Sequence, residues 1–159
     1  MRLDILRAVW GAQRGYVFVP RMKRPKTWDE GPAFKYPDDW PAIEARIKKS
    51  FEEGYDIYWC PHVFDRPQRL KENVKPTLSI LWADLDKVDP TELEELKPSI
   101  AWASSSSRYQ AIWVLDSDHD TEYVERVNRA LTYHIGADKG GWDVTQVLRV
   151  PGSTNHKYD

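Results

Sequence analysis

The apolar run at residues 78 to 83 ends in two acidic residues, Asp84 and Asp86, and this combination constrains the fold more than any other part of the chain. Such a run predicts a buried β-strand, in which successive side chains alternate between faces, so the two carboxylates leave the strand end on one side. Carboxylate oxygens are the ligands that Mg²⁺ and Mn²⁺ prefer, and an Asp pair can hold one ion or bridge two ions roughly 3.5 to 4 Å apart. A solvated strand end that runs into a turn at residues 87 to 90 is an equally weighted alternative.

Length and composition indicate one compact, well-packed unit. A chain of 159 residues is long enough to bury a substantial core, and 41% hydrophobic with 13% aromatic residues excludes a disordered chain. The eight Trp and eight Tyr residues suit a packed core or a surface that stacks on bases, and core is favoured for most of them. The single cysteine, Cys60, cannot form an internal disulfide and indicates a buried free thiol in a reducing compartment.

The charge pattern is local rather than global. A formal net charge of −2 does not by itself point to a nucleic acid partner. Two basic segments, residues 21 to 26 and 66 to 75, could follow a phosphate backbone, although such runs are more often solvated loops. Neither a membrane span nor a signal peptide is present, so we expect a cytoplasmic protein with no membrane partner.

Periodicity predicts an α+β fold in which helices flank a mainly antiparallel sheet. Asp120 is the expected N-cap of the second long helix, and Gly136 its end. A Pro-rich connector is expected over residues 20 to 37, and a short helix after Pro90. The predicted helices span residues 41 to 53 and 120 to 135, and the predicted strands span residues 15 to 20, 56 to 60, 78 to 84, 99 to 103 and 109 to 115.

Two further segments carry groups suited to phosphate. Four consecutive serines precede Arg108 between two predicted strands, where hydroxyls and backbone amides can surround phosphate oxygens; a flexible polar hairpin is the alternative. Around the Pro-Gly turn at residues 151 and 152, donors suited to phosphates or to a base edge come from Arg149, Asn155 and Lys157, against the alternative of a plain turn with surface charges. Asp143, six residues before Arg149, is placed to return a third carboxylate to the first two.

In this order, the three motifs resemble the primase-polymerase domain of the archaeo-eukaryotic primase superfamily, in the form found in plasmid and phage replication proteins. The resemblance covers roughly residues 55 to 159. It rests on the acidic strand end, on the serine run that leads into residues 109 to 113, and on Asp143 followed by the segment from Arg149 to Lys157.

The resemblance implies a DNA-templated nucleotidyltransferase, a primase or DNA polymerase that synthesises primers with two divalent ions, Mg²⁺ or Mn²⁺. It implies that Asp84, Asp86 and Asp143 are catalytic and hold the ions, with Asp138 as the runner-up for the third acid. The implied partners are single-stranded DNA template and nucleoside triphosphates, and the implied location is the cytoplasm of a bacterial or phage-infected host cell. The implied nucleotide-binding residues are Ser104, Ser105, Ser106, Ser107, Arg108, Gln110, Arg149, Asn155, His156 and Lys157.

The same resemblance implies one catalytic domain over residues 1 to 159. Its α/β lobe would span about residues 1 to 75, and its metal-binding core, an antiparallel sheet like that of RNA-recognition-motif domains, about residues 76 to 159. We expect the chain to be a fragment of a longer replication protein, in which a helicase domain could follow.

Gln110 departs from the family pattern, because many members carry a histidine at this position. Glutamine donates a hydrogen bond to a phosphate oxygen but carries no positive charge. An initiator module that binds single-stranded DNA with weak or no catalysis is therefore the main alternative. A metal-dependent nuclease or a sugar-nucleotide transferase, which can also use an Asp pair, is the third hypothesis.

Overall fold

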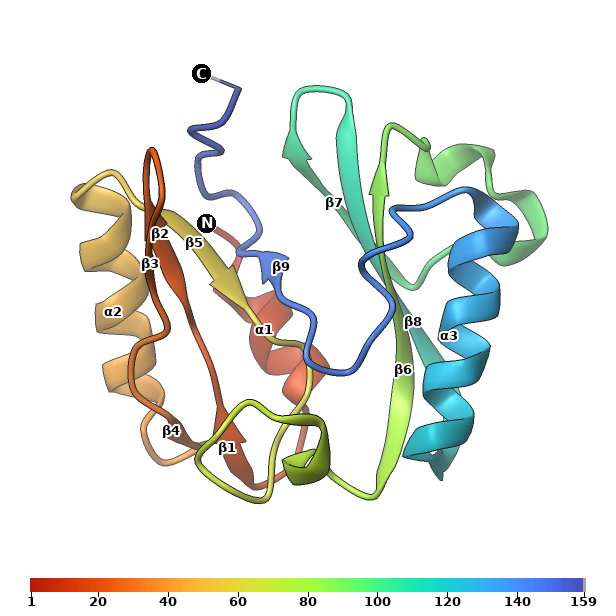
Figure 1. Ribbon diagram of the computed structural model, residues 1–159, viewed down its shortest axis with the longest axis horizontal. Helices are drawn as coiled ribbons and strands as arrows, with labels where there is room; N and C mark the ends of the chain where they lie inside the picture. The colour runs from red at the N-terminus through yellow and green to blue at the C-terminus, as the bar shows by residue number, and fades with distance from the viewer. Residues whose placement is uncertain (159) are drawn as a thin grey trace.

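Two lobes of mixed helix and strand pack against each other in the computed structural model, which describes residues 1–158 (Figure 1). In the first lobe β1 pairs with β4, and a second sheet has the order β3-β2-β5-β9. The elements of this lobe are α1 (Leu3–Trp10), β1 (Gly15–Val17), β2 (Arg21–Lys23), β3 (Thr27–Asp29), β4 (Phe34–Tyr36), α2 (Trp40–Glu52) and β5 (Asp56–Trp59).

The second lobe is a three-stranded sheet, order β6-β8-β7, whose outer face is covered by α3 (Figure 1). After α3 the chain crosses back to the first lobe, where β9 (Leu148–Arg149) pairs with β5. Every strand pairing described is antiparallel. The remaining elements are the 3₁₀ turns Lys71–Asn73, Pro90–Glu92 and Glu94–Leu96, the strands β6 (Thr77–Asp86), β7 (Ile100–Ser105) and β8 (Arg108–Asp120), and the helix α3 (Thr121–Ile135).

The α+β fold with antiparallel sheets is confirmed, and so are the two long helices. The Asp120 side chain accepts a hydrogen bond from the Glu122 N–H at 3.0 Å and caps α3. Gly136 ends this helix with φ of 75°, the left-handed conformation that glycine adopts without steric cost. Local capping signals therefore placed both ends of α3.

Two parts of the first lobe differ from the sequence-based expectation. The connector expected over residues 20 to 37 contains β2, β3 and β4, each only three residues long, which is too short for an alternating pattern to stand out among prolines. The N-terminal segment forms α1, which buries Leu6 and Trp10 completely. The charged residues Arg2, Asp4 and Arg7 lie on the exposed side of this segment. Only the helical spacing of its apolar residues, and not its overall hydrophobicity, indicates the helix.

One hydrophobic core runs through both lobes. In the first lobe, the indole of Trp10 donates to the Cys60 carbonyl at 2.9 Å and packs edge-on against Trp59, with ring centroids 5.8 Å apart. Trp59 lies 6.1 Å from Trp102 of β7, across the junction between the lobes. Cys60 is fully buried, as predicted, and burial raises the pKa of its thiol to about 12. The contact between Trp59 and Trp102 therefore helps to fix the lobes relative to each other.

None of the helices within residues 1–158 is both long enough and apolar enough to cross a membrane.

Candidate active-site cleft

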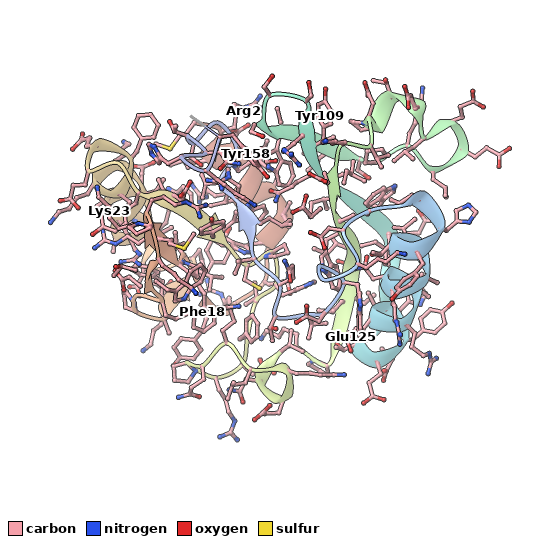
Figure 2. All side chains as sticks on the ribbon, turned by 45° about the horizontal axis from the view of Figure 1, so that its top comes forward. Arg2, Phe18, Lys23, Tyr109, Glu125 and Tyr158 are labelled. Carbon is pink, nitrogen blue, oxygen red and sulfur yellow. The ribbon has the colours of Figure 1, made fainter. Side chains whose placement is uncertain are left out.

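A cavity of about 490 Å³ opens between the two lobes and gathers most of the residues that the sequence singled out. Figure 2 shows the labelled Tyr158, which lines this cleft, between Lys23 of the first lobe and Tyr109 of the second. Three acidic side chains line the cleft together with four cationic ones, Arg24, Arg108, Arg149 and Lys157. The other lining residues are Trp28, Tyr58, Asp84, Asp86, Ser104, Gln110, Asp138, Gln146, Val147, Asn155 and Tyr158.

Asp84 and Asp86 both face the cleft, while Leu85 between them is completely buried. The strand register explains their approach, because Asp84 lies opposite Gln110 and Asp86 opposite Tyr109, so that Leu85 is an extra residue in a β-bulge. Asp86 also has a φ of 49°, which is uncommon for a residue other than glycine. The bulge and this backbone conformation turn the end of β6 and aim both carboxylates into one space.

The environment of Asp84 disfavours its negative charge. Burial is the main factor that raises the pKa of the Asp84 carboxyl, and the nearby charges of Asp138 and Asp86 raise it further. Hydrogen bonds from the Asp86 N–H and from Gln110 act in the opposite direction and lower it. A group of carboxylates crowded in this way is stabilised by a cation placed among them.

The structure brings Asp138, and not Asp143, to the acidic wall of the cleft. Asp138 follows α3, and its N–H donates to the Asp84 carbonyl at 2.8 Å, which fixes its loop against the end of β6. Asp143 does not line the cleft among the described residues. Its carboxylate accepts a hydrogen bond from the Thr145 hydroxyl at 2.5 Å, and its charge acts on Arg69 and Lys71. Sequence spacing alone could not separate the two, because both follow α3 closely.

Arg108, at the start of β8, forms an ion pair with Asp86 at the end of the neighbouring strand β6. The guanidinium shows that the acidic wall accepts a cation, and carboxylate oxygens are the donors that Mg²⁺ and Mn²⁺ prefer, so the residues present fit divalent ions. Within residues 1–158, no three His, Cys, Asp or Glu side chains are already assembled around one ion position. Asp84, Asp86 and Asp138 are the carboxylates that would hold such ions, and Asp86 also pairs with Arg108.

The serine run forms a tight hairpin rather than a long loop. Ser104 and Ser105 belong to β7, and the turn is made by Ser106 and Ser107, with φ of 59° at Ser107. Ser104 lines the acidic cleft. Ser104, Ser105 and Ser106 line an adjoining cavity of about 430 Å³ that shares Arg108, Asn155 and Tyr158 with the cleft, whereas Ser107 lines neither. The Ser105 hydroxyl is buried without a hydrogen-bond partner among the described residues, so Ser104 and Ser106 are the serines of this run whose hydroxyls suit a ligand in the second cavity.

Gln110 links the acidic strand to the C-terminal segment. Its Oε1 accepts a hydrogen bond from the Arg149 N–H at 2.8 Å, and its side chain is also hydrogen-bonded to Asp84. With 6% of its surface exposed, Gln110 is engaged by protein groups rather than presented to a phosphate. The expectation that it donates to the triphosphate gains no support from this geometry, which instead makes it a support for Asp84.

The C-terminal donors have different surroundings. Arg149 is nearly buried and binds Asp56 at 2.6 Å, so its charge is already compensated, while Lys157 is exposed at the cleft. Asn155 is nearly buried and accepts a hydrogen bond from the Lys157 N–H at 3.2 Å. The His156 N–H donates to Asp56, and the residue does not line the cleft. Lys157 is thus the residue of this segment best placed for an incoming anion.

Sequence reasoning did not assign the cleft residues of the first lobe, Arg24, Trp28 and Tyr58, or the C-terminal Tyr158. Arg24 lies in the basic segment of residues 21 to 26, and Trp28 lies in the segment predicted to be a Pro-rich connector. Their approach to the aspartates depends on how the two lobes pack, for which the sequence carries no local signal.

Solved structures share this fold. Primase RepB′ matches with a TM-score of 0.70 at 17% identity over 98% of this chain. The cyanophage S-2L primase-polymerase AEP domain matches with 0.71 at 14% identity, over 98% of this chain and 83% of that one. The RepB′ catalytic domain crystallised in complex with initiator DNA matches with 0.69 at 18% identity, over 98% of this chain and 77% of that one. The fold is therefore that of the catalytic domains of archaeo-eukaryotic primases.

A comparison of the sequence with models of protein families shows the family. The family of the RepB DNA-primase N-terminal domain matches residues 60–159, so the chain belongs to that family. The chain spans 50% of the length of primase RepB′. No curated protein matches it.

Proposed function

We propose that this domain is a DNA-templated nucleotidyltransferase, a primase or DNA polymerase of phage or plasmid replication, that acts on single-stranded DNA with nucleoside triphosphates. The observation that carries the proposal is the division of the cleft into two walls. Asp84, Asp86 and Asp138 supply carboxylates on one side, and the serine cavity with Arg108 and Lys157 supplies hydroxyls and positive charge beside it. This is the arrangement that metal-dependent phosphoryl transfer needs.

The three carboxylates would hold Mg²⁺ or Mn²⁺, with Asp138 in the place that the sequence analysis gave to Asp143. Two divalent ions, when bound, favour loss of the attacking hydroxyl's proton and neutralise charge on the triphosphate. Asp84 and Asp86 are held by the β6 bulge, and Asp138 by the backbone hydrogen bond to Asp84. The orientation of the three carboxylates thus rests on the end of a strand and on a loop that is hydrogen-bonded to it.

Arg108 connects the acidic wall to the triphosphate. It lines both the acidic cleft and the serine cavity, and it pairs with Asp86 in the structure. If a cation neutralised Asp86, the Arg108 guanidinium would be available to pair with phosphate oxygens, and the hydroxyls of Ser104 and Ser106 would donate to the same group.

Extension of a primed template by one labelled nucleotide tests the proposal and separates the two candidates for the third acid. We expect Asp84→Asn, Asp86→Asn and Asp138→Asn each to reduce incorporation to background in Mg²⁺ and in Mn²⁺, because each removes an oxygen ligand. Asp143→Asn is the matched control and should retain activity. Incorporation that survives Asp138→Asn but is lost with Asp143→Asn would return the third metal ligand to Asp143.

The main alternative is an initiator module that binds single-stranded DNA with weak or no catalysis. One observation favours it, namely that Gln110 and Arg149 are both engaged by protein groups and offer little to a triphosphate. Binding of single-stranded DNA by the wild type, with no incorporation in either metal, would support this alternative.

A further inference from the structure

Trp28 of β3 and Tyr58 of β5 form an aromatic pair on the first-lobe wall of the cleft. Their ring centroids are 5.5 Å apart, with an angle of 33° between the planes. The Tyr58 ring lies 5.1 Å from the Arg149 guanidinium, which also donates to the Tyr58 hydroxyl at 3.3 Å. The Trp28 indole N–H donates to Glu30 at 3.2 Å. Trp28 is thus held on a strand, supported by Tyr58 and oriented by Glu30.

Packing does not account for the exposure of Trp28. Its side chain is 44% exposed, whereas Trp10, Trp59 and Trp82 are fully buried. A large aromatic side chain that is fixed at its edge and open on the cleft side is a stacking surface. The ordered indole has already lost most of its rotational freedom, so a flat ligand that stacks on it costs little additional order.

The charges near Trp28 indicate the chemical class of that ligand. Lys157 and Arg24 line the same cleft, although Arg24 is paired with Asp56 at 2.7 Å. Lys23 and Lys26 are exposed on the same β2–β3 hairpin. An aromatic platform bordered by cations suits a nucleobase whose flanking phosphates run past the cations, as in single-stranded nucleic acid.

We propose that Trp28 stacks on a nucleobase of the single-stranded DNA template, with Tyr58 as its support, and that the strand continues over the β2–β3 hairpin. This inference rests on the proposed function, because it takes the bound polymer to be the template. The incoming nucleotide is the other source of a base. Its triphosphate already has the serine cavity beside Arg108, whereas several cations along the hairpin match the repeating phosphates of a strand.

Fluorescence anisotropy of a labelled thymidine oligonucleotide, measured without nucleotide or metal, tests the platform. We expect Trp28→Ala to weaken binding about 5- to 150-fold, the range for loss of one base stack, and Trp28→Phe to recover most of the affinity. The matched control is Tyr133→Ala, which removes a 51% exposed aromatic side chain from α3 and should bind like the wild type. Circular dichroism confirms that each variant is folded.

A second oligonucleotide of the same length, in which the bases are replaced by abasic sites, separates stacking from charge. The difference between the wild type and Trp28→Ala should disappear on the abasic strand. Equal affinities of the wild type and Trp28→Ala for the thymidine oligonucleotide, no detectable binding by the wild type, or an undiminished difference on the abasic strand would each overturn the platform.

A nucleoside triphosphate arm distinguishes the two sources of the base. Trp28→Ala should bind the free nucleotide as the wild type does; weakened nucleotide binding with intact oligonucleotide binding would overturn the template assignment. Because the anisotropy assay needs no incorporation, its result is independent of the proposed activity. A wild type that makes no product but shows base-dependent binding through Trp28 would contradict the enzyme proposal and leave the stacking platform standing.

Discussion

At the scale of single residues, the cleft depends on a short chain of polar contacts that ends at Asp84. The Arg149 N–H donates to Gln110, and the Gln110 side chain is hydrogen-bonded to Asp84. A hydrogen bond to the charged form of a carboxyl favours that form, so Gln110 offsets part of the effect of burial and neighbouring charge on Asp84. Gln110 is therefore a neutral support for the acidic strand that accepts from Arg149 and is hydrogen-bonded to Asp84.

Replacement of Gln110 tests this supporting role. We expect Gln110→Ala to lower nucleotide incorporation about 10- to 100-fold, the usual cost of losing a partner that orients a metal ligand. The Mn²⁺ concentration needed for half-maximal incorporation should rise as well, because Asp84 loses its orientation and part of its charge stabilisation. Urea denaturation shows whether the variant is as stable as the wild type. If it is, and if its Mn²⁺ requirement is unchanged, Gln110 does not support Asp84.

The raised pKa of Asp84 gives a prediction for stability. A carboxyl whose pKa is higher in the folded state than in the unfolded chain destabilises the fold at pH values above the ordinary pKa of about 4, and has no effect when protonated in both states. In the absence of metal, Asp84→Asn should therefore be more stable than the wild type at neutral pH. The difference should shrink as the pH falls toward 3. Urea denaturation at both pH values measures this difference in stability. An Asp84→Asn variant less stable than the wild type at neutral pH would contradict the prediction.

At the scale of elements, the short strand β9 holds the C-terminal segment against the first lobe. Its Arg149 binds the fully buried Asp56 of β5, which also accepts from Arg24 at 2.7 Å and from the His156 N–H at 2.9 Å. Burial acts to raise the pKa of Asp56, but these hydrogen bonds and charges outweigh it and lower the pKa. One carboxylate thus fixes Arg149 and the turn before Lys157 at the cleft.

Loss of Asp56 should be costly. Removal of one partner from a buried ion pair leaves the other charges unpaired, so we expect Asp56→Ala to lower the free energy of unfolding by about 3 to 5 kcal/mol. The control Glu44→Ala breaks an exposed pair with Lys48 and should cost less than about 1 kcal/mol. Because the pKa of Asp56 is lowered by folding, its contribution is present above about pH 4 and is lost as the pH falls through its folded-state pKa. Urea titrations from pH 7 to pH 3 should show this loss in the wild type, and a similar cost for both variants would argue against the buried pair.

The sequence was most informative where a pattern is local. Capping residues and apolar period identified α3, and β-forming residues identified β6 with its two aspartates. The contact between Arg149 and Asp56 joins residues 93 positions apart, so an arginine that looks available in the sequence is paired in the fold. The choice between Asp138 and Asp143 likewise depends on how the loop after α3 docks on Asp84, which residue spacing does not specify.

At the scale of the whole molecule, the cleft exists because two lobes are held in one relative position. Trp59 and Trp102 pack across their junction, and β9 returns from the second lobe to pair with β5. The carboxylates come from the second lobe, while Arg24, Trp28 and Tyr58 come from the first. Metal, triphosphate and template would therefore meet only when both lobes are in place. Assays should use a chain that contains both lobes.

Synthesis on an unprimed, circular single-stranded DNA is the most direct test of whether this domain is a DNA-templated nucleotidyltransferase. The purified chain is incubated with ribonucleotides or deoxynucleotides, and with Mg²⁺ or Mn²⁺, beside Asp86→Asn prepared in the same way. We expect short labelled products that require template, nucleotide and metal and that are absent with Asp86→Asn. Products of equal amount from wild type and Asp86→Asn, or no product from a wild type that binds the template, would contradict this expectation.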